Sequence, residues 1–219
     1  MLKLYSYWRS TAAYRVRIAL NLKRLSYQTI PVHLVKDGGE QHKLEYRAKN
    51  PQGLVPLLEH NGQFLSQSMA ICEYLDETFE GPDLLPAEPF VKAQVRSVCQ
   101  AIGCDIHPVN NLRILKYLQG ELSVSDEAKG AWYHHWIQQG FSALEQQLSQ
   151  FNATDGEVAS FAFGQEPTLA DAFIVAQMYN ARRFDVDLTP YPRLVAIEQH
   201  CLTLDAFKDA QPESQPDAV

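Results

Sequence analysis

The hydrophobic pattern of the first 80 or so residues alternates between short strand-like and longer helix-like segments. Residues 2–7 alternate apolar and polar side chains as a strand does. The predicted elements are strands 2–7, 26–32, 55–59 and 63–66 and helices 12–22, 41–48 and 67–79. Asn61-Gly62, between the last two strands, favours a type I′ hairpin turn. The order β-α-β-α-β-β-α predicts a mixed α/β domain with one antiparallel hairpin at its end.

A composition change follows at residues 82–89, where prolines are frequent and the apolar period is lost. We interpret this segment as a linker between an α/β domain over 1–81 and an all-helical domain over 90–219. The helical half begins with an apolar stripe at Val91, Val95 and Val98, spaced by four and three residues.

A helix start is predicted at Thr168, because Thr168 and Asp171 have the spacing of a capping box, with Asp in place of the usual Glu. We expect this helix to run to about Tyr179. The polar, proline-containing tail at 211–219 is expected to be loosely held.

The net charge of −7 argues against nucleic acid and anionic membranes as partners. The four cysteines form no CxxC pair and are interpreted as reduced core thiols. With an N-terminal apolar run too short for a signal peptide, they predict a cytoplasmic protein. No metal site is expected, because His134 and His135 are adjacent and cannot face one ion from a helix.

Two strand-to-helix junctions are candidate anion sites, since a helix N-terminus offers free amide donors. Ser10 and Thr11 lie at the first junction, and Gln67 and Ser68 lie at the second. For each serine, taken alone, an ordinary helix cap is the alternative and the commoner explanation. Val55-Pro56 opens a strand after a loop and is a candidate cis peptide, with an ordinary trans bond as the alternative.

The helical half holds two further polar groups. Pro108 should kink its helix and free a carbonyl, which would gather His107, Asn111 and Arg113 around the kink. A surface helix with solvated polar groups is the alternative for this segment. Arg183 follows another arginine at a predicted helix end, and the alternative to a functional role is that the helix dipole favours cations there.

The run from Tyr5 to Leu20, YSYWRSTAAYRVRIAL, resembles the zeta class of glutathione transferases, which includes maleylacetoacetate and maleylpyruvate isomerases. The likeness covers the whole chain and includes residues 50–56, 67–68, 164–171 and 185–192. The segment 104–113 looks closest to the maleylpyruvate isomerase branch.

The resemblance implies a thioredoxin-like domain followed by a helical bundle, a homodimer, glutathione as cofactor and cis–trans isomerisation of a small maleyl-type dicarboxylate. Ser10, Thr11 and Arg9 would be the catalytic residues. The implied glutathione contacts are Ser10, Gln41, Val55, Gln67, Ser68 and Asn111. The implied substrate-binding residues are Arg9, Arg113 and Arg183, which would bind the carboxylates, with His107 nearby.

The sequence departs from many zeta members at Ala12, where they have a cysteine. The isomerisation does not need that thiol, because the attacking sulfur belongs to glutathione. Two alternatives remain open: a transferase or peroxidase acting on small electrophiles such as α-haloacids, and a non-catalytic binding protein. Several arginines in an acidic chain favour a dicarboxylate substrate. Maleylacetoacetate and maleylpyruvate both remain candidate substrates.

Overall fold

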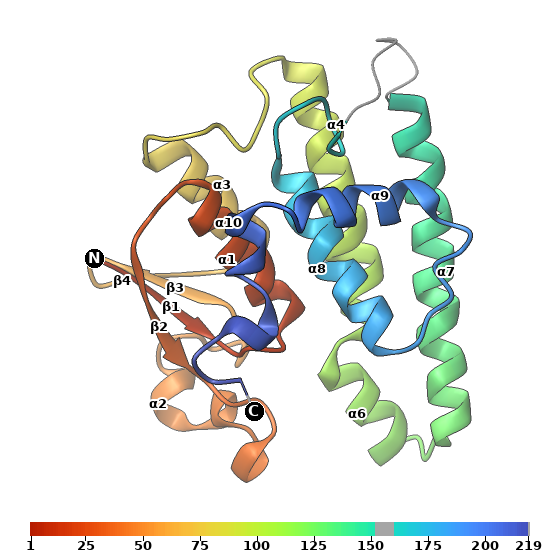
Figure 1. Cartoon of the computed structure of the whole chain (residues 1–219). Helices are drawn as coiled ribbons and strands as arrows, with labels where there is room; N and C mark the ends of the chain where they lie inside the picture. Colours follow the sequence, from red (N-terminus) through yellow and green to blue (C-terminus); the bar gives the residue numbers. More distant parts are fainter. Residues whose placement is uncertain (152–159, 219) are drawn as a thin grey trace. The chain divides into compact units, whose positions relative to one another are not determined.

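The computed structural model describes residues 1–151 and 160–218 of the chain. It divides into two compact units, Met1–Leu85 with Leu202–Val219, and Pro86–Cys201. The first unit contains the sheet, and the second consists of helices (Figure 1).

The first unit is built on a four-stranded mixed sheet in the order β2-β1-β3-β4. The strands are β1 (Leu2–Ser6), β2 (Tyr27–Pro31), β3 (Leu57–His60) and β4 (Gln63–Ser66). β1 pairs with β2 in parallel and with β3 antiparallel, and β3 and β4 form the predicted hairpin. β3 begins two residues later than the pattern predicted, because Pro56 has no N–H to contribute to the ladder.

Alternating side chains of β1 face the two sides of the sheet. Tyr5 and Leu57 pack with Tyr46 of α2 (Leu44–Arg47) in one buried cluster. Leu4 and Leu58 point to the opposite face and are fully buried. That face is covered by α1 (Thr11–Leu22) and α3 (Ser68–Thr78), which pack against each other (Figure 1).

The single helix expected over 41–48 is two separate turns in the structure. A 3₁₀ turn, η2 (Glu40–His42), follows η1 (Lys36–Gly38), and α2 starts only at Leu44. Lys43 between η2 and α2 is extended, with ψ 143°, and therefore ends one turn before the next begins.

The C-terminal segment is the main departure from the predicted organisation. Residues 202–219, which the sequence placed in the helical domain, belong to the first unit. The segment contains α10 (Asp205–Lys208), which packs against α1, and a 3₁₀ turn, η4 (Pro212–Ser214). The expectation of a loosely held tail is wrong, because Asp217 accepts a hydrogen bond from the backbone N–H of Trp8 at 3.0 Å.

The buried guanidinium of Arg17 secures the same segment. Its Nε donates to the carbonyl of Ala210 at 2.9 Å, and its Nη1 and Nη2 donate to Ser6 Oγ and to the carbonyl of Trp8. Residues that are far apart in sequence are thus joined by hydrogen bonds to one charged group, which are among the stronger ones in proteins.

The second unit is organised around one buried helix, α8 (Leu169–Arg183), which packs against α4 (Pro89–Gln100) and α9 (Pro192–Cys201). The other helices are η3 (Ala101–Ile106, a π-helix), α5 (His107–Asn110), α6 (Leu112–Gly120) and α7 (Asp126–Phe151). The predicted capping box at the start of α8 is confirmed. Asp171 accepts hydrogen bonds from the backbone N–H groups of Thr168 at 2.8 Å and Ala162 at 2.7 Å.

Three of the cysteines are buried core thiols, as predicted, whereas Cys104 is exposed. Cys104 lies in η3, outside the apolar stripe that buries Ile102 and Ile106. Among the helices described, none combines the length and the apolar composition needed to cross a bilayer.

Candidate active site

One edge of the sheet collects the residues that the sequence singled out in the first unit. The register pairs Ser6 with Pro31, Tyr5 with Leu57, and Leu57 with Ser66. The C-terminal ends of β1, β2 and β4 and the start of β3 therefore share one edge. The segments that leave or enter at this edge carry Ser10, Gln41, Val55, Gln67 and Ser68.

Ser10 is the N-cap of α1. Its Oγ accepts a hydrogen bond from the N–H of Ala13 at 3.2 Å, so the interpretation as a cap is confirmed. A hydroxyl that accepts still has its own proton to donate. Ser10 can therefore cap the helix and donate to an anion at the same time, beside the positive end of the α1 dipole. Thr11 is buried as the first helical residue.

Arg9 lies immediately before this cap and is exposed. Its guanidinium carbon is 4.0 Å from the centroid of the Trp8 ring. Stacking on an indole holds a guanidinium in place without consuming its N–H donors. Arg9 therefore keeps the donor set that carboxylate binding needs.

The Val55-Pro56 bond is cis, as the sequence had suggested. Val55 is partly buried and packs against the cluster of Tyr5 and Leu57. The preceding carbonyl, of Leu54, accepts hydrogen bonds from Tyr46 Oη at 2.6 Å and from Asn50 Nδ2 at 2.8 Å. Burial raises the pKa of Tyr46, so its hydroxyl keeps the proton that it donates.

Gln67 has a backbone conformation that is rare for its residue type, with φ 74° at the N-cap of α3. Its Nε2 donates to Gln52 Oε1 at 3.0 Å, a partner that the sequence gave no reason to select. The Oγ of Ser68 is buried and accepts from Arg15 Nη1 at 3.3 Å. Non-glycine residues in the left-handed region cost of order 1–3 kcal/mol and concentrate at ligand sites.

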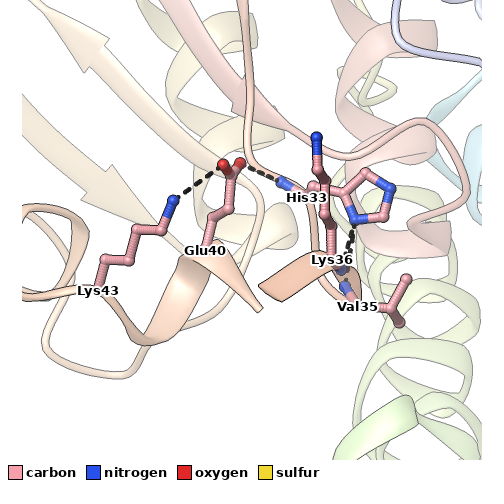
Figure 2. A network of polar contacts seen from close by, with 5 residues as sticks. All are labelled: His33, Val35, Lys36, Glu40 and Lys43. Atoms are coloured by element: carbon pink, nitrogen blue, oxygen red, sulfur yellow. Dashed lines mark hydrogen bonds and ion pairs between the residues drawn. The ribbon is translucent and has the colours of Figure 1, made fainter. Parts of the chain in front are cut away.

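The loop that carries Gln41 is closed by a network of polar contacts, drawn in Figure 2. The carboxylate of Glu40 accepts from the backbone N–H of His33 at 2.8 Å and from Lys43 Nζ at 3.1 Å. His33 Nδ1 in turn accepts from the backbone N–H of Lys36 at 2.9 Å. The hydrogen bond from His33, followed by that from Lys43, lowers the pKa of Glu40, which keeps the carboxylate charged.

Gln41 is the buried side chain that this loop presents. Its Nε2 donates to the carbonyl of Leu34 at 3.2 Å, whereas its Oε1 has no hydrogen-bond partner among the described residues. Gly39 makes room for it, since a Cβ on Gly39 would lie 2.6 Å from the amide atoms of Gln41. A fixed amide with an unused acceptor oxygen is suited to a ligand that carries N–H donors.

In the second unit the helix that contains Pro108 ends at Asn111, whereas before Pro108 the chain stays helical and changes only from π to α geometry at Ile106. The π-helix η3 ends at Ile106, and α6 starts anew after Asn111, whose backbone is extended. Asn111 Oδ1 accepts from the N–H groups of Arg113 at 3.1 Å and Ile114 at 3.2 Å. The side-chain oxygen of Asn111 therefore caps α6, and Arg113 lies exposed in the first turn of that helix.

The break also frees the carbonyl of Val109, which Trp132 Nε1 of α7 binds at 2.9 Å. His107 starts α5 and is half-buried. The carbonyl of Val109 is freed by the end of the helix at Asn111 and is not the one before Pro108 that the sequence predicted. The pairing of Trp132 with Val109 was not predicted, because it depends on how α5 and α7 pack.

The two adjacent arginines at the end of α8 differ in their surroundings. Arg182 Nε donates to both carboxylate oxygens of Glu198 at 3.0 Å, and this interaction raises the pKa of Arg182. Within the described ranges, no carboxylate lies at ion-pair distance from Arg183 or Arg113. Arg182 is thus committed to Glu198, and Arg183 and Arg113 have no carboxylate partner in the part of the chain that the structure describes.

Three consecutive residues of α7 connect the segments that carry Arg113 and Arg183. Trp132 donates to the carbonyl of Val109, just before α6. Tyr133 and His134 contact Phe184, which follows Arg183. These α7 residues were not predicted as part of a site, because nothing in their spacing differs from that of an ordinary amphipathic helix.

A four-stranded mixed sheet with its helices, together with an all-helical unit, is the fold of a glutathione transferase. Residues 4–83 match the family described as "Glutathione S-transferase, N-terminal domain". Together with the relatives below, this shows that the chain belongs to the glutathione S-transferase family.

Within that family the similarity is to isomerases. The chain is 49% identical to a probable maleylacetoacetate isomerase of Vibrio cholerae, over 98% of this chain and 97% of the relative. A holo structure of maleyl pyruvate isomerase, described as a bacterial zeta-class glutathione S-transferase, superimposes with a TM-score of 0.92 at 46% identity, covering 99% and 100% of the two chains. A maleylacetoacetate isomerase from Methylobacterium extorquens AM1 with bound malonate and GSH gives 0.91 at 37% identity, covering 99% of each.

Proposed function

We propose that this chain is a glutathione-dependent cis–trans isomerase that converts maleylacetoacetate or maleylpyruvate to the fumaryl isomer. The observation that carries the proposal is similarity over essentially the full length of isomerases of both names. One of these relatives binds malonate, a small dicarboxylate, together with GSH.

The first unit has the groups that glutathione requires. Gln41 Oε1 is a buried acceptor without a partner among the described residues, and it suits the N–H groups of a peptide. The start of α3, with Gln67 and Ser68, suits the charged γ-glutamyl end, and Val55 offers backbone groups to the cysteinyl part. When bound, glutathione supplies a thiolate that adds to the conjugated cis double bond and leaves after rotation, so that it is not consumed.

Ser10 and the N-terminus of α1 stabilise that thiolate. A free thiol of this kind has a pKa of about 8.5, so only a small fraction is ionised at neutral pH. A hydroxyl donor and the positive end of a helix dipole both favour the anion. Each unit by which they lower the thiol pKa corresponds to about 1.4 kcal/mol. The sulfur comes from the ligand, so Ala12 in place of a cysteine does not remove the reacting group.

Arg9, Arg113 and Arg183 bind the substrate carboxylates and stabilise the negative charge that develops on the keto oxygen, with His107 nearby. Guanidinium groups match carboxylates with two parallel hydrogen bonds. For Arg113 and Arg183 the support is that neither is engaged by a carboxylate of the described chain, whereas Arg182 is. Asn111 acts through its backbone and amide nitrogen, since its oxygen caps α6. We further propose a cytoplasmic homodimer, which is consistent with the family resemblance and the reduced cysteines.

A spectrophotometric assay with maleylacetoacetate and maleylpyruvate, each with and without glutathione, tests the function. We expect turnover of at least one substrate, and only with glutathione present. Conjugation of an α-haloacid with no isomerisation of either substrate would replace the proposal with the transferase alternative. Glutathione binding with no turnover of any of these compounds would indicate a binding protein.

A further inference from the structure

The end of α8 is fixed by a set of contacts that meet at Phe184, the residue after Arg183. The N–H of Val186 donates to the carbonyl of Ala181 at 3.1 Å, and the N–H of Asp185 donates to that of Arg182 at 3.1 Å. Asp185 has φ 54°. This is a Schellman motif with a left-handed residue after the last helical turn.

The carbonyl of Phe184, within this motif, is bound by a side chain of α7. His134 Nε2 lies 2.7 Å from that oxygen. Because a carbonyl can only accept, Nε2 carries the proton and donates it. A single side chain of α7 therefore satisfies the backbone group that follows Arg183.

Tyr133 holds the ring of the same residue. The Tyr133 and Phe184 rings are stacked, with centroids 4.0 Å apart and an interplanar angle of 23°. The guanidinium carbon of Arg183 lies 5.1 Å from the Phe184 centroid. The hydroxyl of Tyr133 has no hydrogen-bond partner among the described residues, so its ring is what contributes to this arrangement.

We propose that His134 and Tyr133 are positioning residues that hold Arg183, through Phe184, in the geometry required for carboxylate binding. The proposal rests on the proposed function for the role of Arg183. It requires the donor on His134 and the ring of Tyr133, and it does not require the Tyr133 hydroxyl. The stacking of Tyr133 on Phe184 and the hydrogen bond from His134 restrict the backbone next to Arg183. Because less conformational entropy is then lost when the exposed Arg183 side chain binds a carboxylate, the affinity is higher.

The test measures the affinity of maleate, a cis-dicarboxylate, by calorimetry in the absence of glutathione. We expect His134→Leu to weaken maleate binding by up to about tenfold, the scale of one hydrogen bond to a neutral carbonyl. His134→Gln places an amide donor near the position of Nε2 and should recover most of the affinity. Tyr133→Phe should bind maleate as the wild type does, and Tyr133→Leu should bind it more weakly. His135→Leu, on the neighbouring exposed residue, is the matched control and should have no effect.

A double-mutant cycle separates positioning from general loosening of the fold. If His134 acts through Arg183, then His134→Leu adds no further loss in an Arg183→Ala background. Glutathione affinity should be unchanged in all of these variants. Maleate binding by His134→Leu equal to wild type, additive losses in the double mutant, or no recovery in His134→Gln would each overturn the proposal.

The same measurements keep this proposal distinct from the isomerase assignment. A wild-type protein that binds maleate through Arg183 and His134 but isomerises neither maleyl compound would refute the isomerase function and support the positioning role. Normal isomerase activity with an Arg183→Ala variant that binds maleate fully would support the function and refute the positioning role.

Discussion

At the scale of single residues, Ser10 and Gln41 show how one side chain can serve both the fold and the ligand. Ser10 uses its oxygen to cap α1 and keeps its proton, and Gln41 uses its nitrogen within the loop and keeps its oxygen. The functional and structural interpretations of such residues are therefore compatible, and they are separated by substitutions that remove one role at a time.

Ser10→Ala should raise the thiol pKa of bound glutathione by about one unit and cost about 1 kcal/mol of stability, because it removes both the donor and the cap. Ser10→Asp keeps an acceptor for the Ala13 N–H but has no proton to donate and adds a negative charge. It should retain stability and raise the thiol pKa further. Ultraviolet titration of the bound thiolate and denaturant unfolding measure the two effects. A titration curve unchanged in Ser10→Ala would remove Ser10 from the site.

Gly39→Ala should weaken glutathione binding about tenfold, the effect of losing one well-placed hydrogen bond, because the new Cβ would displace the Gln41 amide. Gly38→Ala is the matched control. Gly38 also has a positive φ, of 80°, but a Cβ there meets nothing within 4 Å. Both variants carry backbone strain, and only Gly39→Ala should lose glutathione affinity in calorimetry. Equal losses in the two would mean that strain in the loop, and not Gln41, sets the affinity.

At the scale of elements, the breaks and packing of the second unit decide where its polar groups lie. The helix changes from π to α geometry at Ile106 and ends at Asn111, and α7 packs against η3, the segment that ends at Ile106. Two glycines of α7 offer a direct test of that packing.

Gly140→Ala should destabilise the protein by about 1–3 kcal/mol, because the added Cβ would clash with Cδ1 and Cγ1 of the buried Ile106. Gly130→Ala on the same helix meets nothing within 4 Å and should stabilise it by about 0.5–1 kcal/mol through helix propensity. Denaturant unfolding of both variants measures the difference. The prediction is wrong if both substitutions change the free energy of unfolding in the same direction.

Asp171 at the start of α8 should give stability a pH dependence. Burial raises its pKa from 3.8 to about 6, against the hydrogen bonds that it accepts. The folded state then binds more protons than the unfolded state between about pH 4 and 6, so stability falls as the pH rises through that range. The drop is of order 3 kcal/mol. Asp171→Asn does not titrate, so the stability difference between wild type and this variant should be larger at pH 4 than at pH 7. An identical difference at both values would contradict the prediction.

At the scale of the whole molecule, residues from the two ends of the chain meet in the first unit. Trp8, two residues before Ser10, donates its N–H to Asp217, and Arg17 binds the carbonyl of Ala210. The C-terminal segment is therefore part of the structure that holds the β1–α1 junction in place.

Asp217→Ala should lower stability by about 1 kcal/mol, the typical net value of one hydrogen bond, and weaken glutathione binding. Asp209→Ala removes the same charge from an exposed position of that segment and is the control. Calorimetry with glutathione and thermal unfolding provide the measurements. A deletion of residues 211–219 that leaves both quantities unchanged would show that the segment has no part in the site.

Local patterns in the amino-acid sequence were enough to predict the order of elements in the first unit, the hairpin at Asn61-Gly62, the capping box at Thr168 and a change in the helix near Pro108. These features depend on periodicity and on the conformational limits of Gly, Pro and capping residues, which act locally. Motifs such as residues 5–20 and 50–56 also identified the family, because a family resemblance is carried by short motifs in a fixed order along the chain.

Three features became known only from the packing of the folded chain: which of two neighbouring arginines forms an ion pair, where the C-terminal segment packs, and which side chains of α7 contact Phe184 and Val109. Each of these depends on the partner that another element brings into contact, and no local pattern encodes that partner. Arg182 and Arg183 are equivalent in the sequence, and Glu198 on α9 makes them different.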